Sequence, residues 1–303
     1  MTSSGSIPRI GVIVLNWNGA DDTIACLESL RRADPTANRV VVVDNASTDD
    51  SVTRIRDWSR LNAMDVEIVV APTNRGFAGG NNLGIDLLAK DPGITHFLLL
   101  NNDATVAEDF FGEMKRALSA VPSAGLLTGT IYEHPARERV WYAGGKEIRS
   151  RALIEHLRVP PTEAAPVPTE FVSGCVMLIS REALSEIGPL ADCYFPLYME
   201  DAEYSLRARA AGLPVLYAPR VRAFHKIGAT VGMASASPFI TQAQVRHRVL
   251  YVRRNFRGVE RAIALAYLAM TKPAKALAET LGGRPKMGLA VFKGTFEGFV
   301  ARI

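Results

Sequence analysis

The fold is decided first by residues 9–19, which read Arg-Ile-Gly-Val-Ile-Val-Leu-Asn-Trp-Asn-Gly. A short apolar run rich in β-branched residues, followed by polar residues and a glycine, is typical of a buried strand that ends in a loop. Beyond it, Ile24, Leu27 and Leu30 are spaced for one face of a helix, and an aspartate pair before them can cap its start. The chain therefore opens with a predicted strand and helix.

The same alternation continues along the chain. Strands are expected at residues 39–43, 66–70 and 96–100, and helices from residue 47 to 58, at about 83–88 and at about 110–120. Strands that alternate with helices predict an α/β fold with a mostly parallel sheet and helices on both faces.

Polar residues follow each of the four predicted strands. They are Asn16, Asp44, Asn74 and Asp103. In a parallel sheet, ligands bind beyond the carboxyl ends of the strands, which lie at one edge. We therefore expect these four polar clusters to form one site.

The second half of the chain is less regular. Residues 131–170 contain scattered prolines and only weak strand patterns, which we interpret as an insertion. Beyond it, regular structure is expected as a strand at 171–179, a helix from about Tyr198 that Gly212 ends, and strands at 215–217 and 221–225.

From Thr241 the pattern is helical to the end of the chain. An apolar stripe is expected at Val245, Val249, Val252 and Phe256, and a basic face at Arg246, Arg253 and Arg257. Residues 240–303 hold twelve Lys or Arg against three Glu, so the net charge of +4 belongs to this tail. A basic tail can contact nucleic acid or an anionic membrane, and charge alone does not choose between them.

Composition bounds the class of protein. With 303 residues, 48% of them apolar and 22% charged, the chain is long enough for one large domain with or without an appendage. Its cysteines, Cys26, Cys175 and Cys193, are far apart, which favours neither a disulfide framework nor a zinc site and fits a reducing cytosol. The N-terminus lacks the apolar core of a signal peptide, and no stretch approaches about 20 apolar residues, so a cytoplasmic location is expected.

Two acidic groups can carry chemistry. Asp103, after Asn101 and Asn102, can hold a divalent cation that neutralises a diphosphate, or it can cap the following turn. Asp201 and its neighbour Glu200 can supply the base that accepts a hydroxyl proton, or they can place favourable charge at a helix N-terminus.

Three further features have two readings each. His225 ends a strand, where its imidazole can bind a metal together with Asp103 or can be a hydrogen-bonded, partly buried residue. Asp44 can accept the imide N–H of a pyrimidine or can cap the turn at Ser47. The glycines of residues 76–80 can approach an anion, but they match neither the dinucleotide fingerprint nor the P-loop. The sequence also lacks a nucleophile elbow and a His-Glu-x-x-His motif, which weakens dehydrogenase, kinase and hydrolase assignments.

Taken together, seven motifs resemble, in order, the signature of the family 2 inverting glycosyltransferases of the GT-A fold. They are Val12–Gly19, Val43–Asp49, Asn74–Asn82, Leu99–Asp103, Ser173–Met177, Tyr198–Asp201 and His225–Gly228. The resemblance covers about residues 8–228 and is nearest to the rhamnosyltransferase-like branch that builds bacterial surface polysaccharides. It implies a GT-A catalytic domain at 8–239, with a nucleotide-binding half at about 8–130 and an acceptor-side half at about 131–239, and a basic helical appendage at 240–303.

The resemblance also implies a role for each motif residue. The nucleotide and donor sugar would be held by Leu15, Asn16, Asn18, Asp44, Asn45, Asn74, Gly76, Phe77, Asn81, Asn82 and Asn102. Asp103 and His225 would bind Mg²⁺ or Mn²⁺, and Asp201, beside Glu200, would be the catalytic base. The family's Asp-x-Asp metal motif begins with Asn101 here, which reduces the local negative charge.

The implied reaction is a single displacement that inverts the anomeric carbon. The donor would be a dTDP- or UDP-sugar, with L-rhamnose first on family grounds, and the acceptor a hydroxyl of a glycan or lipid-linked glycan. The branch often ends in basic amphipathic helices, so residues 240–303 would contact the inner membrane surface as a peripheral protein, rather than nucleic acid. The alternative for these helices is packing against the domain or a second copy in a homodimer.

Two other functions compete with this interpretation. A sugar-nucleotide nucleotidylyltransferase would need a basic, glycine-rich loop after the first strand, and residues 15–19 have no basic group. A non-catalytic nucleotide-sugar-binding subunit of a synthase is favoured by Asn101, but Glu200 and Asp201 argue against it because binding alone requires no base.

Overall fold

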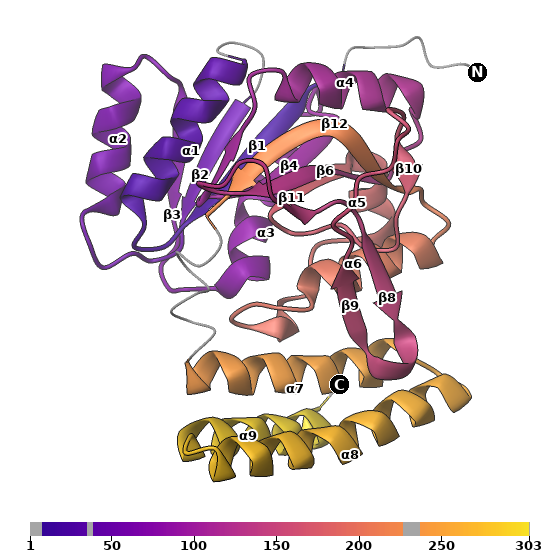
Figure 1. Ribbon diagram of the computed structural model, residues 1–303. Helices are drawn as coiled ribbons and strands as arrows, with labels where there is room; N and C mark the ends of the chain where they lie inside the picture. Colours follow the sequence, from indigo (N-terminus) through magenta and orange to yellow (C-terminus); the bar gives the residue numbers. More distant parts are fainter. Residues whose placement is uncertain (1–7, 35–38, 227–236, 303) are drawn as a thin grey trace.

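The four predicted strand–helix units all form. The computed structural model describes residues 8–34, 39–226 and 237–302, so the last two residues of the motif His225–Gly228 lie outside the described part. The first half comprises β1 (Ile10–Asn16), α1 (Ala20–Ala33), β2 (Arg39–Asp44), α2 (Ser51–Leu61), β3 (Val66–Val70), α3 (Gly76–Ala89) and β4 (His96–Asn101) (Figure 1).

These strands belong to a ten-stranded sheet whose main path runs β10-β12-β6-β11-β4-β1-β2-β3. Strand β1 pairs in parallel with both β2 and β4, and β2 pairs in parallel with β3. Strand β11 is antiparallel to β4 and β6, whereas β12 is parallel to β6. The prediction of an α/β fold with a mostly parallel sheet is confirmed.

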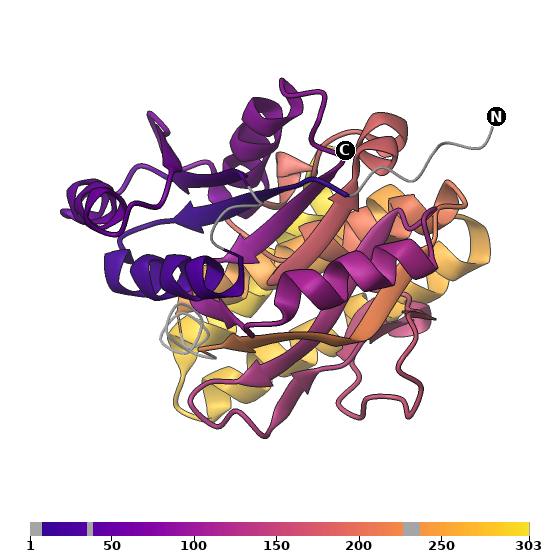
Figure 2. The ribbon, with the colours of Figure 1, turned by 90° about the horizontal axis from the view of Figure 1, so that it is seen from above.

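Helices cover both faces of the sheet because its central strands carry apolar side chains on both faces. Val12 and Val14 of β1 pack in one buried cluster with Leu27 of α1. Ile13 points the other way and packs in a second cluster with Leu88 of α3. Figure 2 shows α4 lying across the strands nearest the viewer, with the C-terminal helices at the far side.

Helix α3 starts at Gly76, earlier than the predicted start near Leu83. Its glycines weaken the helical pattern in the sequence, but they let the helix approach the sheet. A Cβ on Gly80 would lie 2.4 Å from Leu15 Cδ1, and one on Gly84 would lie 2.6 Å from Ile13 Cγ2. The residues considered as an anion-binding loop are therefore the first turns of a closely packed helix.

The second half contains more β-structure than expected. It comprises β5 (Ala104–Val106), α4 (Phe110–Ala120), β6 (Leu126–Glu133), β7 (Val140–Tyr142), β8 (Gly145–Ile148), the 3₁₀ turn η1 (Arg149–Arg151), β9 (Leu153–His156), β10 (Val167–Pro168), β11 (Val176–Ser180), α5 (Arg181–Ile187), η2 (Asp192–Tyr194), α6 (Glu200–Ala210) and β12 (Val215–His225). The segment 131–170, interpreted as an irregular insertion, supplies sheet strands and the β8–β9 hairpin. Strands this short carry too few residues for a recognisable alternation.

One long strand, β12, replaces the two short strands predicted around residue 219. Its pairing with β6 shifts register between Ala218 and Arg222. Pro219 has no N–H to give the ladder, and its carbonyl instead accepts a hydrogen bond from Thr130 Oγ1 (2.9 Å). The sequence pattern around Pro219 therefore resembled two separate strands, although the structure has one strand with a shift in register.

Three helices end the chain: α7 (Pro238–Asn255), α8 (Gly258–Leu281) and α9 (Pro285–Val300). The predicted stripe of α7 is buried, and Val249 and Tyr251 join the same cluster as β1. Buried Glu147 of β8 accepts hydrogen bonds from Tyr251 Oη of α7 (2.6 Å) and Arg209 Nη2 of α6 (2.7 Å). Helix α7 thus packs on the domain, and α8 and α9 lie beyond it (Figure 1).

Candidate active site

The carboxyl ends of the parallel strands bring the predicted site residues to one edge. Asn16 and Asp44 are register partners at the ends of β1 and β2, and Leu15 is paired with Asn101 at the end of β4. The antiparallel β11 reaches the same edge with its amino end, because the backbone N–H of Asn101 donates to the Cys175 carbonyl (3.1 Å).

A network of polar groups joins the loops after β1 and β2. The buried Asp44 carboxylate accepts hydrogen bonds from Ser47 Oγ (2.6 Å), Ser47 N (3.0 Å) and Asn16 Nδ2 (2.7 Å). Asn18, whose φ is 50°, donates its backbone N–H to Ser47 Oγ (2.8 Å) and accepts from Thr48 N (2.8 Å). The turn-capping reading of Asp44 is therefore realised. Trp17, exposed by 54% between these groups, is the aromatic residue of the first motif.

A second network joins this edge to the loop before α6. Asn45 Nδ2 donates to Asn74 Oδ1 and to the Gly76 carbonyl, both at 3.1 Å. Gly76 has a φ of +67°, and a Cβ there would lie 2.5 Å from the Pro196 carbonyl oxygen. Phe77 N donates to that same oxygen (2.8 Å). Glycine is required at this close approach.

The remaining residues that were predicted to bind the donor differ in what their side chains contact. Asn81 Nδ2 is taken by the Phe77 carbonyl (2.9 Å) within α3. Asn82 exchanges two hydrogen bonds with the backbone of Leu190 (2.9 and 3.1 Å), so its amide holds α3 to the segment after α5. Asn102, half-buried, donates to Thr23 Oγ1 (3.2 Å) and stays at the edge.

Asp103 and His225 lie together, as predicted. Both are buried, and Asp103 Oδ1 is 3.1 Å from His225 Nε2. The Lys226 backbone N–H donates to the Asp103 carbonyl (3.0 Å), which holds the ends of β5 and β12 together. Cis ligands of an octahedral ion with bonds of about 2.1 Å are about 3 Å apart, so these two atoms can share one divalent cation. Within residues 8–34, 39–226 and 237–302, no three His, Cys, Asp or Glu side chains cluster as a metal site.

Asp201 lies in the first turn of α6 with its carboxylate fixed by backbone amides. Oδ2 accepts from Gly174 N (3.0 Å) and Oδ1 from Ala202 N (2.8 Å). Burial raises the pKa of Asp201, although these amides oppose the rise. Burial, and then the charge of Asp201, raise the pKa of the buried Glu200 well above its ordinary value. A raised pKa makes a carboxylate a stronger base, which suits proton abstraction.

The turn before this pair is strained. Tyr198 and Met199 have φ values of 81° and 82°, which cost non-glycine residues about 1–3 kcal/mol each. His247 of α7 holds the segment, because its Nδ1 donates to the Leu197 carbonyl (3.1 Å). Sequence reasoning missed His247 and the Gly174 amide. The motif Ser173–Met177 was the only signal for the second.

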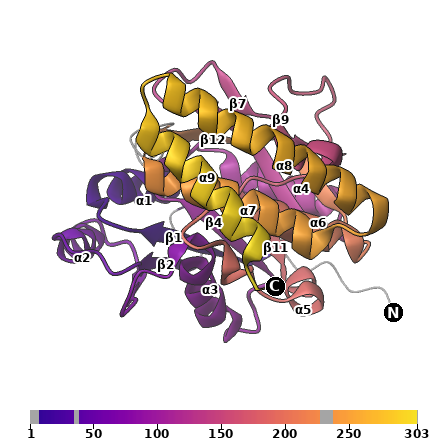
Figure 3. The same ribbon diagram turned by 90° about the horizontal axis from the view of Figure 1, so that it is seen from below.

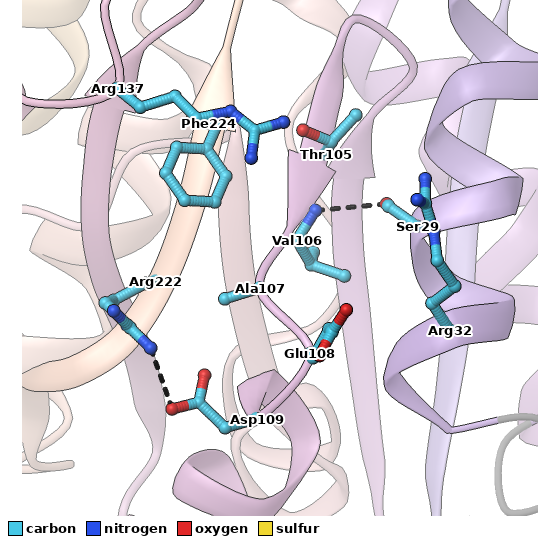
Figure 4. Close-up of a pocket in the computed structure, with 10 residues that line it drawn as sticks. All are labelled: Ser29, Arg32, Thr105, Val106, Ala107, Glu108, Asp109, Arg137, Arg222 and Phe224. Carbon is cyan, nitrogen blue, oxygen red and sulfur yellow. Dashed lines mark hydrogen bonds and ion pairs between the residues drawn. The ribbon is translucent and has the colours of Figure 1, made fainter.

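A separate hollow of about 470 Å³ opens beside β5 and β12. Its lining includes Arg137, stacked on Phe224 with 4.7 Å from Cζ to the ring centroid, and Arg222, paired with Asp109 (2.9 Å) (Figure 4). None of the predicted site residues lines it.

Solved structures define the class of this fold. GalNAc-T7 with UDP, GalNAc and Mn²⁺ has a TM-score of 0.64 at 15% identity over 82% of this chain and 48% of its own. The mannosyltransferase PcManGT from Pyrobaculum calidifontis, in complex with GDP-Man and Mn²⁺, has a TM-score of 0.61 at 18% identity over 98% of this chain and 89% of its own. The fold is therefore GT-A-like, as the motifs implied.

Comparison of the sequence with known families identifies the family of this chain. Residues 11–188, more than half of it, match the profile of Glycosyl transferase family 2, and the chain belongs to that family. It is also 25% identical over 223 residues to the low-salt glycan biosynthesis hexosyltransferase Agl10 of Haloferax volcanii. That match spans 71% of this chain and 66% of the relative. In the part of the chain that the structure describes, no helix is long and apolar enough to cross a membrane.

Proposed function

We propose that this protein is an inverting hexosyltransferase that moves a sugar from a dTDP- or UDP-sugar to a hydroxyl of a glycan or lipid-linked acceptor. L-Rhamnose is the first candidate for the sugar. The observation that carries the proposal is Asp201, a half-buried carboxylate with a raised pKa that two amides hold at the edge of the sheet. Binding alone would not require such a group.

Asp201 would accept the proton of the acceptor hydroxyl as its oxygen attacks the anomeric carbon opposite the nucleotide, and the anomer would invert. The amides of Gly174 and Ala202 fix both carboxylate oxygens, so the base needs little reorganisation. Burial and the neighbouring Asp201 raise the pKa of Glu200, which favours its neutral form and would avoid a second charge beside the base.

Asp103 and His225 would hold the Mg²⁺ or Mn²⁺. The ion, when bound, supplies positive charge to the departing diphosphate. A site of two side chains suits such an ion, because Mg²⁺ usually retains water and substrate phosphate oxygens as further ligands. Asn101, in place of an acidic residue, keeps the site less negative.

The nucleotide would lie on the loops after β1 and β2. Leu15, Asn16, Asn18 and Asp44 would contact the base and ribose, and Asn45, Asn74, Gly76, Phe77, Asn81, Asn82 and Asn102 the rest of the donor. A carboxylate has about four acceptor positions, of which Asp44 uses three, so one remains for a pyrimidine imide. The exposed ring of Trp17 offers a surface on which the base can stack.

The test is a binding and hydrolysis screen of purified protein against UDP-, GDP- and dTDP-sugars, with and without Mg²⁺ or Mn²⁺. We expect metal-dependent turnover of one dTDP- or UDP-sugar, lost in Asp103→Ala. Binding without hydrolysis or transfer, with acceptors supplied, would favour the non-catalytic subunit. No binding by a folded protein would refute both functions.

A lipid-linked acceptor would bring the enzyme to the inner face of a membrane, and we propose the tail at 240–303 as the contact. A homodimer is the competing arrangement. The membrane contact and the homodimer each require that residues 240–303 present a surface that the rest of the chain does not cover.

A further inference from the structure

The outward faces of α8 and α9 are apolar along almost their whole length. Large exposed side chains lie on both helices, at Val259, Ile263, Met270, Leu277 and Leu281, and at Leu289, Phe292, Phe296 and Val300. Exposure reaches 78% at Leu281 and 62% at Phe296. We call these nine side chains the α8–α9 face.

The spacing shows that this face is one continuous stripe on each helix. On α8 the large apolar residues follow one another by four or seven positions, and the exposed positions between them are mostly alanine. On α9 the steps are three, four and four. Each helix buries its other side, with Ala264 and Leu268 of α8 and Val291 of α9 fully enclosed. Helices that are apolar on both sides are unusual on a protein surface facing water.

Small residues draw the two helices into one layer. A Cβ on Gly288 of α9 would lie 2.1 Å from Thr280 Oγ1 of α8. On the other side of α9, a Cβ on Gly294 would lie 2.3 Å from the Gln242 carbonyl oxygen of α7. In Figure 3, α8 and α9 lie side by side in front of α7. The two stripes therefore belong to one outer surface of the molecule.

The charges around this face have one sign. Lys275, Lys286 and Lys293 are exposed and form no salt bridge within the described residues. Of the three acidic groups on the same helices, Glu260 pairs with Arg149 and Glu279 with Arg284 (2.9 Å), and Glu297 accepts a hydrogen bond from Gln242 of α7 (2.7 Å). Excess positive charge next to an apolar stripe is the combination that binds an anionic lipid surface.

We propose that the α8–α9 face lies in the boundary between headgroups and acyl chains of an anionic bilayer, with its lysines on the lipid phosphates. This rests on the proposed function only in naming the bilayer that would carry a lipid-linked acceptor. A second copy fits less well, because it would bring an equally basic surface against the same lysines. The stripe predicted on α7 plays no part, since it is buried in the domain.

In this arrangement α7 lies between the lipid surface and the proposed catalytic base, Asp201. Its His247 holds the Leu197 carbonyl before Glu200 and Asp201, and α9 packs against it on the lipid side. The base would therefore sit one helical layer above the membrane.

The experiment measures cosedimentation of the full chain with vesicles of phosphatidylcholine, with or without about one third phosphatidylglycerol. The wild type should bind the anionic vesicles. Phe292→Asp with Phe296→Asp should weaken binding at least about tenfold for each residue, because each removes a buried aromatic side chain. Each of Lys275→Gln, Lys286→Gln and Lys293→Gln should weaken it about fivefold.

Matched controls come from the catalytic domain. Leu61, 86% exposed at the end of α2, and the exposed Lys90 should tolerate Leu61→Asp and Lys90→Gln with unchanged vesicle binding. Thermal unfolding verifies that each variant is folded. Wild-type binding by the Phe292/Phe296 variant overturns the proposal. So does a wild-type dimer that this variant dissociates, with no vesicle binding by either. Donor hydrolysis is scored separately, so a chain that binds vesicles but turns over no sugar refutes only the proposed function.

Discussion

Replacing Glu200 by glutamine should make the protein more stable at neutral pH. Glu200 is buried, its Oε2 has no hydrogen-bond partner within the described residues, and burial together with Asp201 raises its pKa well above 4.5. An ionised carboxylate in that position therefore opposes folding. Glutamine has the same shape and no charge.

The sign of the pH dependence follows from linkage. Below about pH 4.5, Glu200 is protonated in both folded and unfolded chains, so the variant and the wild type should be equally stable. Above it, the unfolded chain loses the proton first, and the wild type loses stability until the pH reaches the raised pKa of the folded chain. The difference then becomes constant. Over that interval proton linkage changes stability by up to about 1.4 kcal/mol per pH unit, so we expect a gain of at least that order at pH 7.5.

The assay is thermal unfolding of Glu200→Gln and wild type between pH 4.5 and 8. A gain of 1 kcal/mol corresponds to a rise of about 2 °C in Tm for a chain of this size. Glu186→Gln, at an exposed site on α5, is the control and should leave Tm unchanged. A destabilised Glu200→Gln, or a difference in Tm that does not vary with pH, would show that Glu200 is paired and would refute the reasoning.

Three further predictions follow from the same site. Asp201→Asn should lower transfer by about 10²–10⁴-fold with donor affinity nearly unchanged, whereas the exposed Asp192→Asn should alter neither; an active Asn variant in a kinetic assay would remove Asp201 as the base. Gly76→Ala should destabilise the protein by at least about 1–3 kcal/mol because of its φ of +67° and the Pro196 carbonyl, whereas Gly112→Ala, on an open face of α4, should stabilise it by about 0.5–1 kcal/mol; equal Tm changes would contradict this contrast. Burial lowers the pKa of His247 to about 4, so folded His247 stays neutral and its share of stability is lost as pH falls from 6.5 toward 4. His247→Asn, which can still donate to Leu197, should reduce that loss by about 2 kcal/mol at pH 5, and an unchanged pH profile of urea unfolding would count against it.

The first half of the fold was predictable because its signals are local. Strands β1, β2 and β4 contain continuous apolar runs, and Asn16, Asp44 and Asp103 lie at or just after their ends. The carboxyl ends of parallel strands must meet, so the pairing of Asp103 with a distant residue could be expected once His225 was identified at another strand end. The motif resemblance supplied that residue's role.

The second half of the chain could not be predicted in the same way. Strands β7 to β10 have two to four residues each, and their pairing depends on partners far away in the chain. Gly174 acts through a backbone amide that no side-chain pattern reveals. Asn82 has the residue type of a ligand contact, but its partner Leu190 lies 108 positions away. Only the tertiary structure shows which polar side chains are already used.

The tail is the clearest case of a pattern whose meaning depends on its partner. Sequence periodicity identified the apolar stripe of α7, which is buried, and passed over those of α8 and α9, which are exposed. All three stripes are apolar, and they differ in whether another part of the chain covers them. Helix α7 contacts the Leu197 carbonyl through His247, next to the turn at Tyr198 and Met199 with its positive φ values, while α9 packs on the other side of α7. Helix α7 therefore connects the proposed membrane contact to the segment that precedes the proposed base.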